Sequence, residues 1–188
     1  IAEYPEIQFS LKMRLGWENV SECMVLVELL NAIRLSRIAL HARTGKQQYK
    51  GHPDLEAFQG FYELCQHPLY YNGGIESLSD IRQILTRFPL LKGVFIGRGL
   101  LSSPLLAKEF KGNETFLPEQ RMSIYFAFHE ELFSAYSQVL QGETQLLVKM
   151  KTLWEYFLPE TDRKLLKRIK KSTRLQQYTE SVKAIFTS

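Results

Sequence analysis

Four short apolar runs divide the first hundred residues of the chain, and their regular spacing is the feature that most limits its fold. The runs recur every 25 to 32 residues and are IQFSLKM (7–13), SRIALH (36–41), PLYYN (68–72) and GVFIG (93–97). Longer segments with helical spacing lie between them, and one of these opens with Ser77 as a candidate cap. This alternation predicts four βα units with parallel strands, and therefore an α/β fold.

The pattern changes after Pro104. From there the chain shows helical periodicity without a further strand, over residues 119–141, 144–158 and 161–186. We therefore divide the chain into an α/β part, about 1–110, and an all-α part, about 111–188. The segment KGNETFLPE carries Gly, Asn and Pro between them, which is typical of a linker.

Four βα units on their own leave a parallel sheet with two open edges, whereas eight units would close a barrel. The chain also begins almost directly with a strand, at Ile7, and its first residue is Ile1 rather than Met. We therefore expect the C-terminal half of a (β/α)8 TIM barrel, followed by an all-α helical domain. The alternative is a small sheet that is stable by itself.

Composition narrows the class of protein. The chain has 188 residues, of which 45% are hydrophobic and 23% charged, which is typical of a globular protein. No run reaches the ~18 uncharged apolar residues of a membrane helix, and the first residues do not resemble a secretory signal. Cys23 and Cys65 lie in helix-like surroundings, which favours two reduced thiols over a disulfide. We expect a cytoplasmic monomer with no membrane contact and no metal site.

The positive charge is concentrated near the C-terminus. Nine basic residues between Lys149 and Arg174 face three acidic ones, an excess of six in a chain whose net charge is +4. A concentrated basic helix indicates a partner with a phosphate backbone, although a solvated helix face has the same appearance. The candidate RNA contacts are Lys164, Lys167, Arg168, Lys170, Lys171 and Arg174.

Each apolar run ends in polar or glycine-rich residues. The four ends are Lys12-Met13-Arg14, His41-Ala42-Arg43, Asn72-Gly73-Gly74 and Gly97-Arg98-Gly99. Any one of them could be structural, but active sites of barrels form where the strands end, and Lys12 and Arg14 point the same way on a strand. The sequence therefore predicts a functional site at this edge of the sheet.

The third and fourth of these ends suggest a phosphate site. Glycine lets backbone N–H groups approach a ligand closely, and arginine supplies a planar positive fork. Barrels often bind phosphate at the loops after their last two strands, beside the N-terminus of a short helix. If the four strands are the fifth to eighth of a barrel, the site would hold the phosphate of a substrate or of FMN.

At these residues the chain resembles a known family. The segments LKMRLGW, IALHARTGKQQYKG, YYNGGIES and VFIGRGLLSSPLL, in this order and at this spacing, are similar to the second half of the tRNA-dihydrouridine synthases. Those are FMN enzymes with a barrel followed by a helical tRNA-binding domain. The stretch LVKMKTLWEYF and the later DRKLLKRIKKS are similar to that domain, so the resemblance covers nearly the whole chain. Its most specific part is HART…Y.G together with the Lys-x-Arg strand.

The resemblance implies roles for individual residues. Arg14 and Arg43 would lie where the target uracil of the tRNA enters, and Arg14 could donate to its carbonyl groups. A lysine near the pyrimidine edge of the flavin would stabilise the negative charge of the reduced ring. The residues that match the family's flavin motifs are Lys12, His41, Asn72, Gly73, Gly74, Gly97 and Arg98.

The resemblance also implies a reaction. NADPH would reduce FMN, hydride would pass from the flavin to C6 of a uridine that has left the tRNA stack, and a cysteine would protonate C5. The family carries that cysteine in an Asn-x-x-Cys-Pro motif, which this sequence lacks, and neither Cys23 nor Cys65 ends a strand. We therefore expect the acid to be missing with the first half of the barrel, and the chain alone not to catalyse the reaction. At Gly74 many relatives carry an acidic residue.

Two other functions fit parts of the pattern. The chain could be a non-catalytic RNA-binding module in which a remnant barrel only supports the basic helices. It could also be a phosphate-binding barrel of different chemistry, such as a sugar-phosphate isomerase. The latter requires a carboxylate at a strand end, and the four ends contain none.

Overall fold

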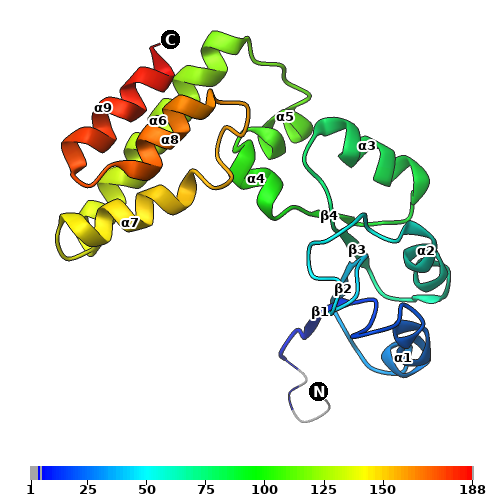
Figure 1. Cartoon of the computed structure of the whole chain (residues 1–188). Helices are drawn as coiled ribbons and strands as arrows, with labels where there is room; N and C mark the ends of the chain where they lie inside the picture. The colour runs from blue at the N-terminus through cyan, green and yellow to red at the C-terminus, as the bar shows by residue number, and fades with distance from the viewer. Residues whose placement is uncertain (1–3, 5, 188) are drawn as a thin grey trace. The chain divides into compact units, whose positions relative to one another are not determined.

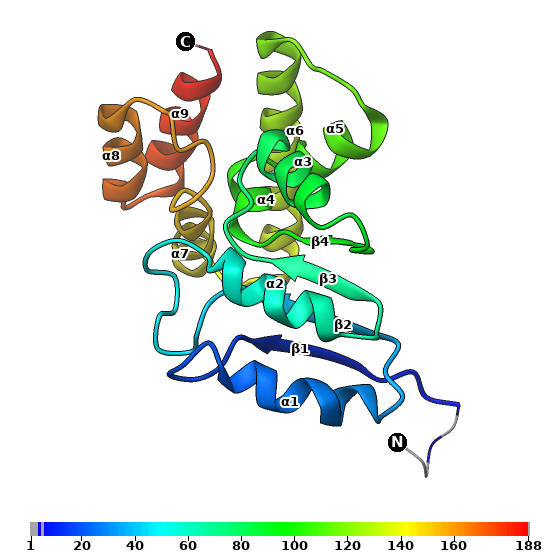
Figure 2. The same cartoon turned by 90° about the vertical axis from the view of Figure 1, so that its right-hand side faces the viewer.

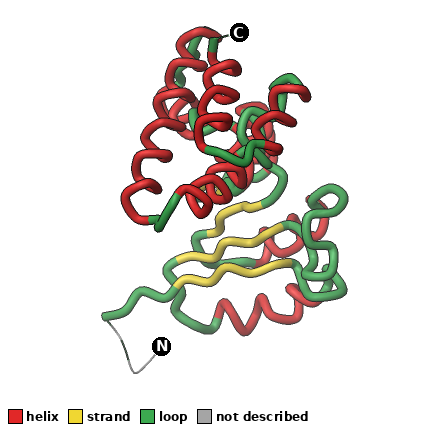
Figure 3. The backbone as a smooth tube through the Cα atoms, turned by 60° about the vertical axis from the view of Figure 1, so that its left-hand side comes forward, coloured by secondary structure: helices red, strands yellow, loops and turns green. Residues whose placement is uncertain are grey.

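The computed structural model describes Tyr4 and residues 6–187 of the chain, so Ile1 lies outside the described residues. The chain forms two compact units, Ile1–Gly97 and Arg98–Ser188. Strands and helices alternate in the first unit, and the described residues of the second form helices joined by loops (Figure 3). Each unit is described by itself below.

The first unit is a four-stranded parallel sheet in the order β1-β2-β3-β4, with one helix after each of the first three strands. The four predicted strands and their parallel arrangement are thus confirmed. The elements are β1 (Ser10–Arg14), α1 (Glu22–Asn31), β2 (Arg37–His41), α2 (Leu55–Leu64), β3 (Leu69–Asn72), α3 (Leu78–Arg87) and β4 (Gly93–Phe95).

The two faces of this sheet differ. Helices α1, α2 and α3 all lie on one side of it (Figures 1 and 2). On that side Tyr71 of β3 packs edge-to-face on Phe58 of α2, whose ring also contacts Phe88, and all three rings are buried. Successive side chains of a strand point to opposite faces, so Lys12, His41 and Asn72 lie on the other face, which no described helix of this unit covers.

Local hydrogen bonds set the starts of two helices. The predicted cap at Ser77 is confirmed: its hydroxyl accepts from the N–H of Asp80 at 3.1 Å, and the Asp80 carboxylate accepts from the N–H of Ser77 at 2.8 Å. In α2 the carboxylate of Asp54 accepts from the N–H of Ala57 at 2.9 Å. These caps fix where the chain turns after β2 and β3, and therefore the shape of the loops at the C-terminal edge of the sheet.

The second unit packs six described helices around one apolar core. They are α4 (Arg98–Ser102), α5 (Leu106–Gly112), α6 (Pro118–Val139), α7 (Glu143–Leu153), α8 (Arg163–Lys171) and α9 (Leu175–Phe186). The helical periodicity predicted over 161–186 is interrupted, because Ser172 ends α8 and its hydroxyl donates to the carbonyl of Ile169 at 2.6 Å. The interruption lets α8 and α9 lie side by side (Figure 1) and bury Ile169 and Tyr178 in the same core.

The division between the units lies at Gly97, earlier than the boundary near residue 110 that the sequence pattern suggested. Helices α4 and α5 pack with the helical unit. The hydroxyl of Ser103 lies 2.8 Å from that of Tyr125 on α6, and buried Glu109 of α5 forms an ion pair with Arg121 of α6. These contacts join residues far apart in the sequence, and the domain boundary near residue 110 stays a prediction.

Three further findings concern membranes, metals and thiols. Within the described part of the chain no helix is long and apolar enough to cross a membrane, and no cluster of three or more His, Cys, Asp or Glu side chains could hold a metal ion. Cys23 and Cys65 have free thiols. Burial raises the pKa of both thiols, so they are poor nucleophiles and poor proton donors near neutral pH.

Candidate functional site

The C-terminal edge of the sheet carries a row of polar side chains on the face without helices. Arg14 is paired in register with His41, and His41 with Asn72, while Lys12 lies two residues before Arg14 on the same face. Adjacent strands are ~4.8 Å apart, so these groups are neighbours. The structure therefore brings Lys12, Arg14, His41 and Asn72 together at one edge. We call this group the polar row.

Arg43 holds the ring of His41 in place. His41 and Arg43 are both buried, and Nη1 of Arg43 lies 3.3 Å from Nε2 of His41. Guanidinium groups only donate hydrogen bonds, so Nε2 accepts, and the neutral ring then carries its proton on Nδ1. Nη2 of Arg43 donates to the carbonyl of Gly51 at 2.9 Å. Arg43 thus connects the polar row to the loop that follows β2.

Arg14 holds the same loop from the first strand. Its Nη1 donates to the carbonyl oxygens of Thr44 and Gln48, at 2.7 and 3.0 Å. Its guanidinium also lies over the ring of Tyr49, 5.7 Å from the centroid. The two arginines predicted for the uracil site therefore shape the loop over residues 44–53. Whether they also contact a base stays a prediction.

The turn after β3 requires glycine at two positions. Gly73 has φ +132° and Gly74 has φ +60°, conformations that side chains disfavour. A Cβ on Gly73 would lie 3.0 Å from Cδ2 of His41, and one on Gly74 would lie 3.0 Å from Cγ of Pro53. The backbone therefore lies directly against the polar row, and any side chain at position 74 would be strained and crowded.

The remaining residues predicted for the flavin are Asn72, Gly97 and Arg98. The Asn72 amide donates to the carbonyl of Phe95 at 2.8 Å, which ties the ends of β3 and β4 together. A Cβ added at Gly97 would meet no described atom within 4 Å. Arg98 is the first residue of α4 and belongs to the second unit, so its part in the site stays a prediction.

The basic cluster of the helical unit forms a groove between α8 and α9. Four of the six predicted RNA contacts line this groove, which has a volume of about 410 Å³. They follow one another at the spacing of a single helix face and are Lys164, Lys167, Arg168 and Lys171. Lys170 and Arg174 do not line it. We call this feature the basic groove.

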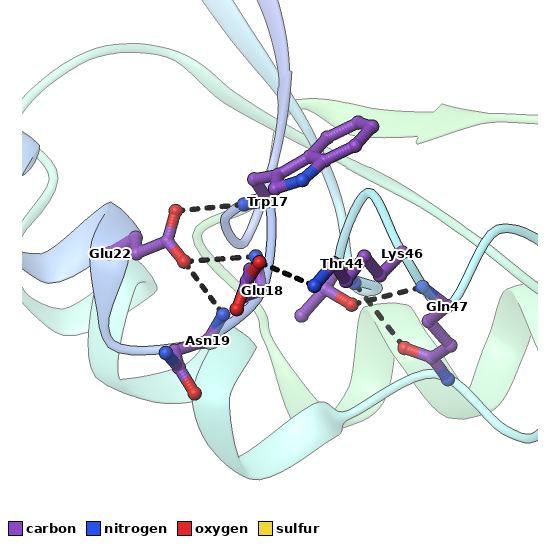
Figure 4. A network of polar contacts seen from close by, with 7 residues as sticks. All are labelled: Trp17, Glu18, Asn19, Glu22, Thr44, Lys46 and Gln47. Carbon is purple, nitrogen blue, oxygen red and sulfur yellow. Dashed lines mark hydrogen bonds and ion pairs between the residues drawn. The ribbon is translucent and has the colours of Figure 1, made fainter.

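Sequence reasoning missed the rim formed by the loops after β1 and β2. The carboxylate of Glu22 accepts three backbone N–H groups, from Trp17, Glu18 and Asn19, at 2.8, 2.9 and 2.7 Å (Figure 4). These bonds, that from Asn19 most of all, lower the pKa of Glu22. The signal in the sequence was an acid a few residues after Gly16-Trp17, but its contacts needed the folded loop.

The chain is similar to known proteins over most of its length. The family model described as "Dihydrouridine synthase (Dus)" matches residues 3–187 of the chain. A probable tRNA-dihydrouridine synthase of Rhizobium leguminosarum bv. phaseoli is 35% identical over 100 residues, which are 53% of this chain and 31% of that protein. One of Aquifex aeolicus is 35% identical over 105 residues, which are 56% of this chain and 33% of the relative.

A relative of more specific name is also similar. The tRNA-dihydrouridine(16) synthase of Escherichia coli is 28% identical over 110 residues, 58% of this chain and 35% of that enzyme. The matched part is about a third of the length of each of these three relatives. The family model covers both structural units, and the motifs that end β1 to β4 lie within it. The chain therefore belongs to the dihydrouridine synthase family.

Proposed function

We propose that this chain provides the flavin site and an RNA-binding part of an FMN-dependent tRNA-dihydrouridine synthase, an oxidoreductase that reduces uridine to 5,6-dihydrouridine in tRNA. The observation that carries the proposal is the polar row: a lysine, an arginine, a buried histidine and an asparagine lie together at the C-terminal edge of a parallel sheet. This is the edge at which α/β enzymes place their chemistry.

The proposed function also implies a barrel, of which this sheet would be one half. Parallel sheets normally have both faces covered, yet α1, α2 and α3 cover only one face of this sheet (Figure 2). The other face is polar where the strands end, as the interior of a barrel is beside its active site. We therefore propose that β1 to β4 are the second half of an eight-stranded barrel and that the helical unit is its tRNA-binding domain.

The residues present fit FMN. Gly73 and Gly74 keep backbone close to the row with no side chain in the way, and Gly97 leaves open space beside its Cα among the described atoms. Lys12 is an exposed cation on the same face as His41 and Asn72. These groups would hold the ring and ribityl chain, and Arg98 with the glycines would bind the phosphate. When bound, FMN supplies hydride transfer.

The chain's own residues prepare the site for that chemistry. Lys12 supplies positive charge where the flavin ring would become anionic. Arg43 keeps the proton of His41 on Nδ1, so Nε2 is an acceptor. The acid that protonates C5 is neither cysteine of this chain, because Cys23 lies in α1 with its thiol toward the carbonyl of Val20, and Cys65 follows α2. NADPH would provide the electrons.

The basic groove would bind the tRNA backbone. Four cations on one face of α8 can contact successive phosphates and release counterions on binding. With this partner the protein would work in the cytoplasm, as a monomer, because one chain carries both the flavin site and the groove.

A flavin titration tests the proposal. FMN should bind to the chain, and its fluorescence should fall as it binds. Arg98→Ala should weaken that binding. Arg82→Ala, at an exposed position of α3, should not. A chain that binds tRNA through the basic groove but takes up no FMN would instead be a non-catalytic RNA-binding module. Equal effects of both substitutions would overturn the phosphate assignment.

A further inference from the structure

Trp17 is an exposed aromatic side chain on a rigid loop. It lies three residues after Arg14, the last residue of β1, and 65% of its surface is accessible, whereas Trp154, the other tryptophan, is 2% exposed. Figure 4 shows its indole pointing away from Glu22, beyond the backbone of the loop. An exposed tryptophan is not unusual by itself. The contacts by which the loop fixes Trp17, however, indicate a function for its side chain.

Two sets of contacts hold Trp17. Its N–H and the next two N–H groups bond to the carboxylate of Glu22, whose lowered pKa keeps that acceptor charged. Its carbonyl accepts from the N–H of Lys46 at 2.9 Å, and the carbonyl of Gly16 accepts from that of Gly45 at 2.7 Å. The two loops therefore form one unit, and the backbone of Trp17 is ordered before any partner binds.

The indole ring of Trp17 packs on the backbone of Gly45. A Cβ added there would lie 2.3 Å from Cε3 of Trp17, so the indole rests directly on the backbone of residue 45. No positive φ explains this glycine. Its missing side chain instead allows the ring to lie flat against the second loop, with its other surface facing solvent.

The two loops carry charges of both signs, with Glu18 and Glu22 on the side of Trp17 and Lys46 and Lys50 on the loop of Gly45. Lys46 forms an ion pair with Glu18, and Lys50 is exposed farther along the same loop. Arg14 lies at the base of that loop beneath Tyr49. A docking site for another protein would need an apolar patch around its central aromatic. A rigid aromatic surface with two lysines on the neighbouring loop instead matches the chemistry of an unpaired nucleobase with its phosphates.

We propose that Trp17 is a stacking platform for an unpaired RNA base, held at the same edge of the sheet as the polar row. The inference rests on the proposed function, since it assigns a further contact to the same RNA partner. A base extruded from tRNA leaves neighbouring bases without a stacking partner, and the indole can replace one. Gly45 and Glu22 are positioning residues, because they act through the ring and its backbone.

The fluorescence of Trp17 tests this directly. The emission of the wild-type chain minus that of Trp17→Phe isolates Trp17 without altering buried Trp154. A short single-stranded oligouridylate should quench this difference signal, and an abasic ribose-phosphate strand of equal length should not. Trp17→Ala should weaken oligouridylate binding roughly 5- to 150-fold, the range of base–aromatic stacking, and Trp17→Phe should restore most of it.

Gly45→Ala gives a matched test, since it should displace the ring while keeping it, and should weaken binding in the same direction. Binding of the labelled oligouridylate without quenching, or equal quenching by the abasic strand, would overturn the proposal. So would a change in emission that depends only on protein concentration, because a second copy would then cover the ring.

The outcome is separable from the proposed function. If substitutions in the basic groove abolish tRNA binding while Trp17→Ala has no effect, Trp17 is not a platform and the proposed function stands. If oligouridylate quenches Trp17 while the chain binds neither FMN nor tRNA, the platform stands and the proposed function fails.

Discussion

Nη1 of Arg43 lies 3.3 Å from Nε2 of His41, two residues earlier in the chain, and both side chains are buried. The same guanidinium donates to the carbonyl of Gly51. One side chain therefore sets the tautomer of a histidine in the polar row and the position of the loop beside it. The arginine of the motif HART thus connects its neighbour His41 to the backbone eight residues later, at Gly51.

Arg43→Ala should loosen this loop. The N–H groups of Gly45 and Asp54 are bonded to carbonyls of Gly16 and Ala42, and the substitution removes a buried donor worth about 1–3 kcal/mol. Hydrogen exchange at these two amides should quicken by roughly 5- to 150-fold, while amides of α3 keep their protection. Unchanged exchange at both amides would mean that Arg43 does not hold the loop.

Gly74→Ala should destabilise the first unit. An alanine in this left-handed conformation costs about 1–2 kcal/mol, and its Cβ would also press on Pro53. The urea midpoint of the first unit should fall. Gly97→Ala is the matched control, because its Cβ would meet no described atom within 4 Å, so it should leave the midpoint unchanged and weaken only FMN binding. Equal midpoints for the two variants would contradict the crowding at Gly74.

Substitutions in the basic groove should reduce the salt dependence of tRNA binding. Lys167→Ala with Lys171→Ala removes two cations one turn apart on the groove face, so the slope of log K against log salt should fall by roughly 1 per lost phosphate contact. Binding measured by fluorescence anisotropy at several KCl concentrations gives that slope. Lys111→Ala with Arg163→Ala removes the same charge at residues that do not line the groove, and an equal fall there would show that only net charge matters.

The helical unit should lose stability as the pH falls, because of buried His129. Trp154 Nε1 donates to the hydroxyl of Tyr178 at 3.0 Å, and that hydroxyl lies 2.7 Å from Nε2 of His129, which accepts from it. Burial lowers the pKa of His129, and the Glu130 carboxylate at 3.1 Å from Nδ1 only partly opposes this. If the ring of His129 were protonated, Nε2 would carry a hydrogen and could no longer accept from Tyr178. The hydroxyl of Tyr178 would then face two donors, Nε2 of His129 and Nε1 of Trp154.

The direction of this pH dependence follows from the pKa of His129 in the folded and in the unfolded chain. The folded pKa lies below the unfolded value of 6.5, so the unfolded chain binds more protons between them, and stability present above pH 6.5 is lost as the pH falls through the folded pKa. Thermal unfolding measured from about pH 7.5 down to about pH 5 should show this loss, because that interval includes the ordinary histidine pKa of about 6.5. His129→Gln keeps an acceptor for Tyr178 and should flatten the profile; an equally steep profile would assign the loss to other groups.

Local sequence patterns were enough to predict the strands and to predict that Lys12 and Arg14 of the polar row lie on one face of the sheet. Apolar runs at regular intervals indicated four parallel strands, and Lys12 and Arg14 differ by two positions, so a strand places them on one face. The cap at Ser77 was equally readable, because its partner Asp80 is three residues away. These features depend on backbone periodicity and on near neighbours, which the order of residues determines directly.

Tertiary structure decided the rest. Arg14 bonds to carbonyls 30 and 34 residues away, and the indole of Trp17 rests on Gly45, so neither role could be seen along the chain. The interruption after Lys171 and the membership of α5 in the helical unit depend on which distant side chains share a core. Sequence periodicity states which face of an element is apolar, but only folding determines what that face meets, because side-chain contacts depend on distances in space.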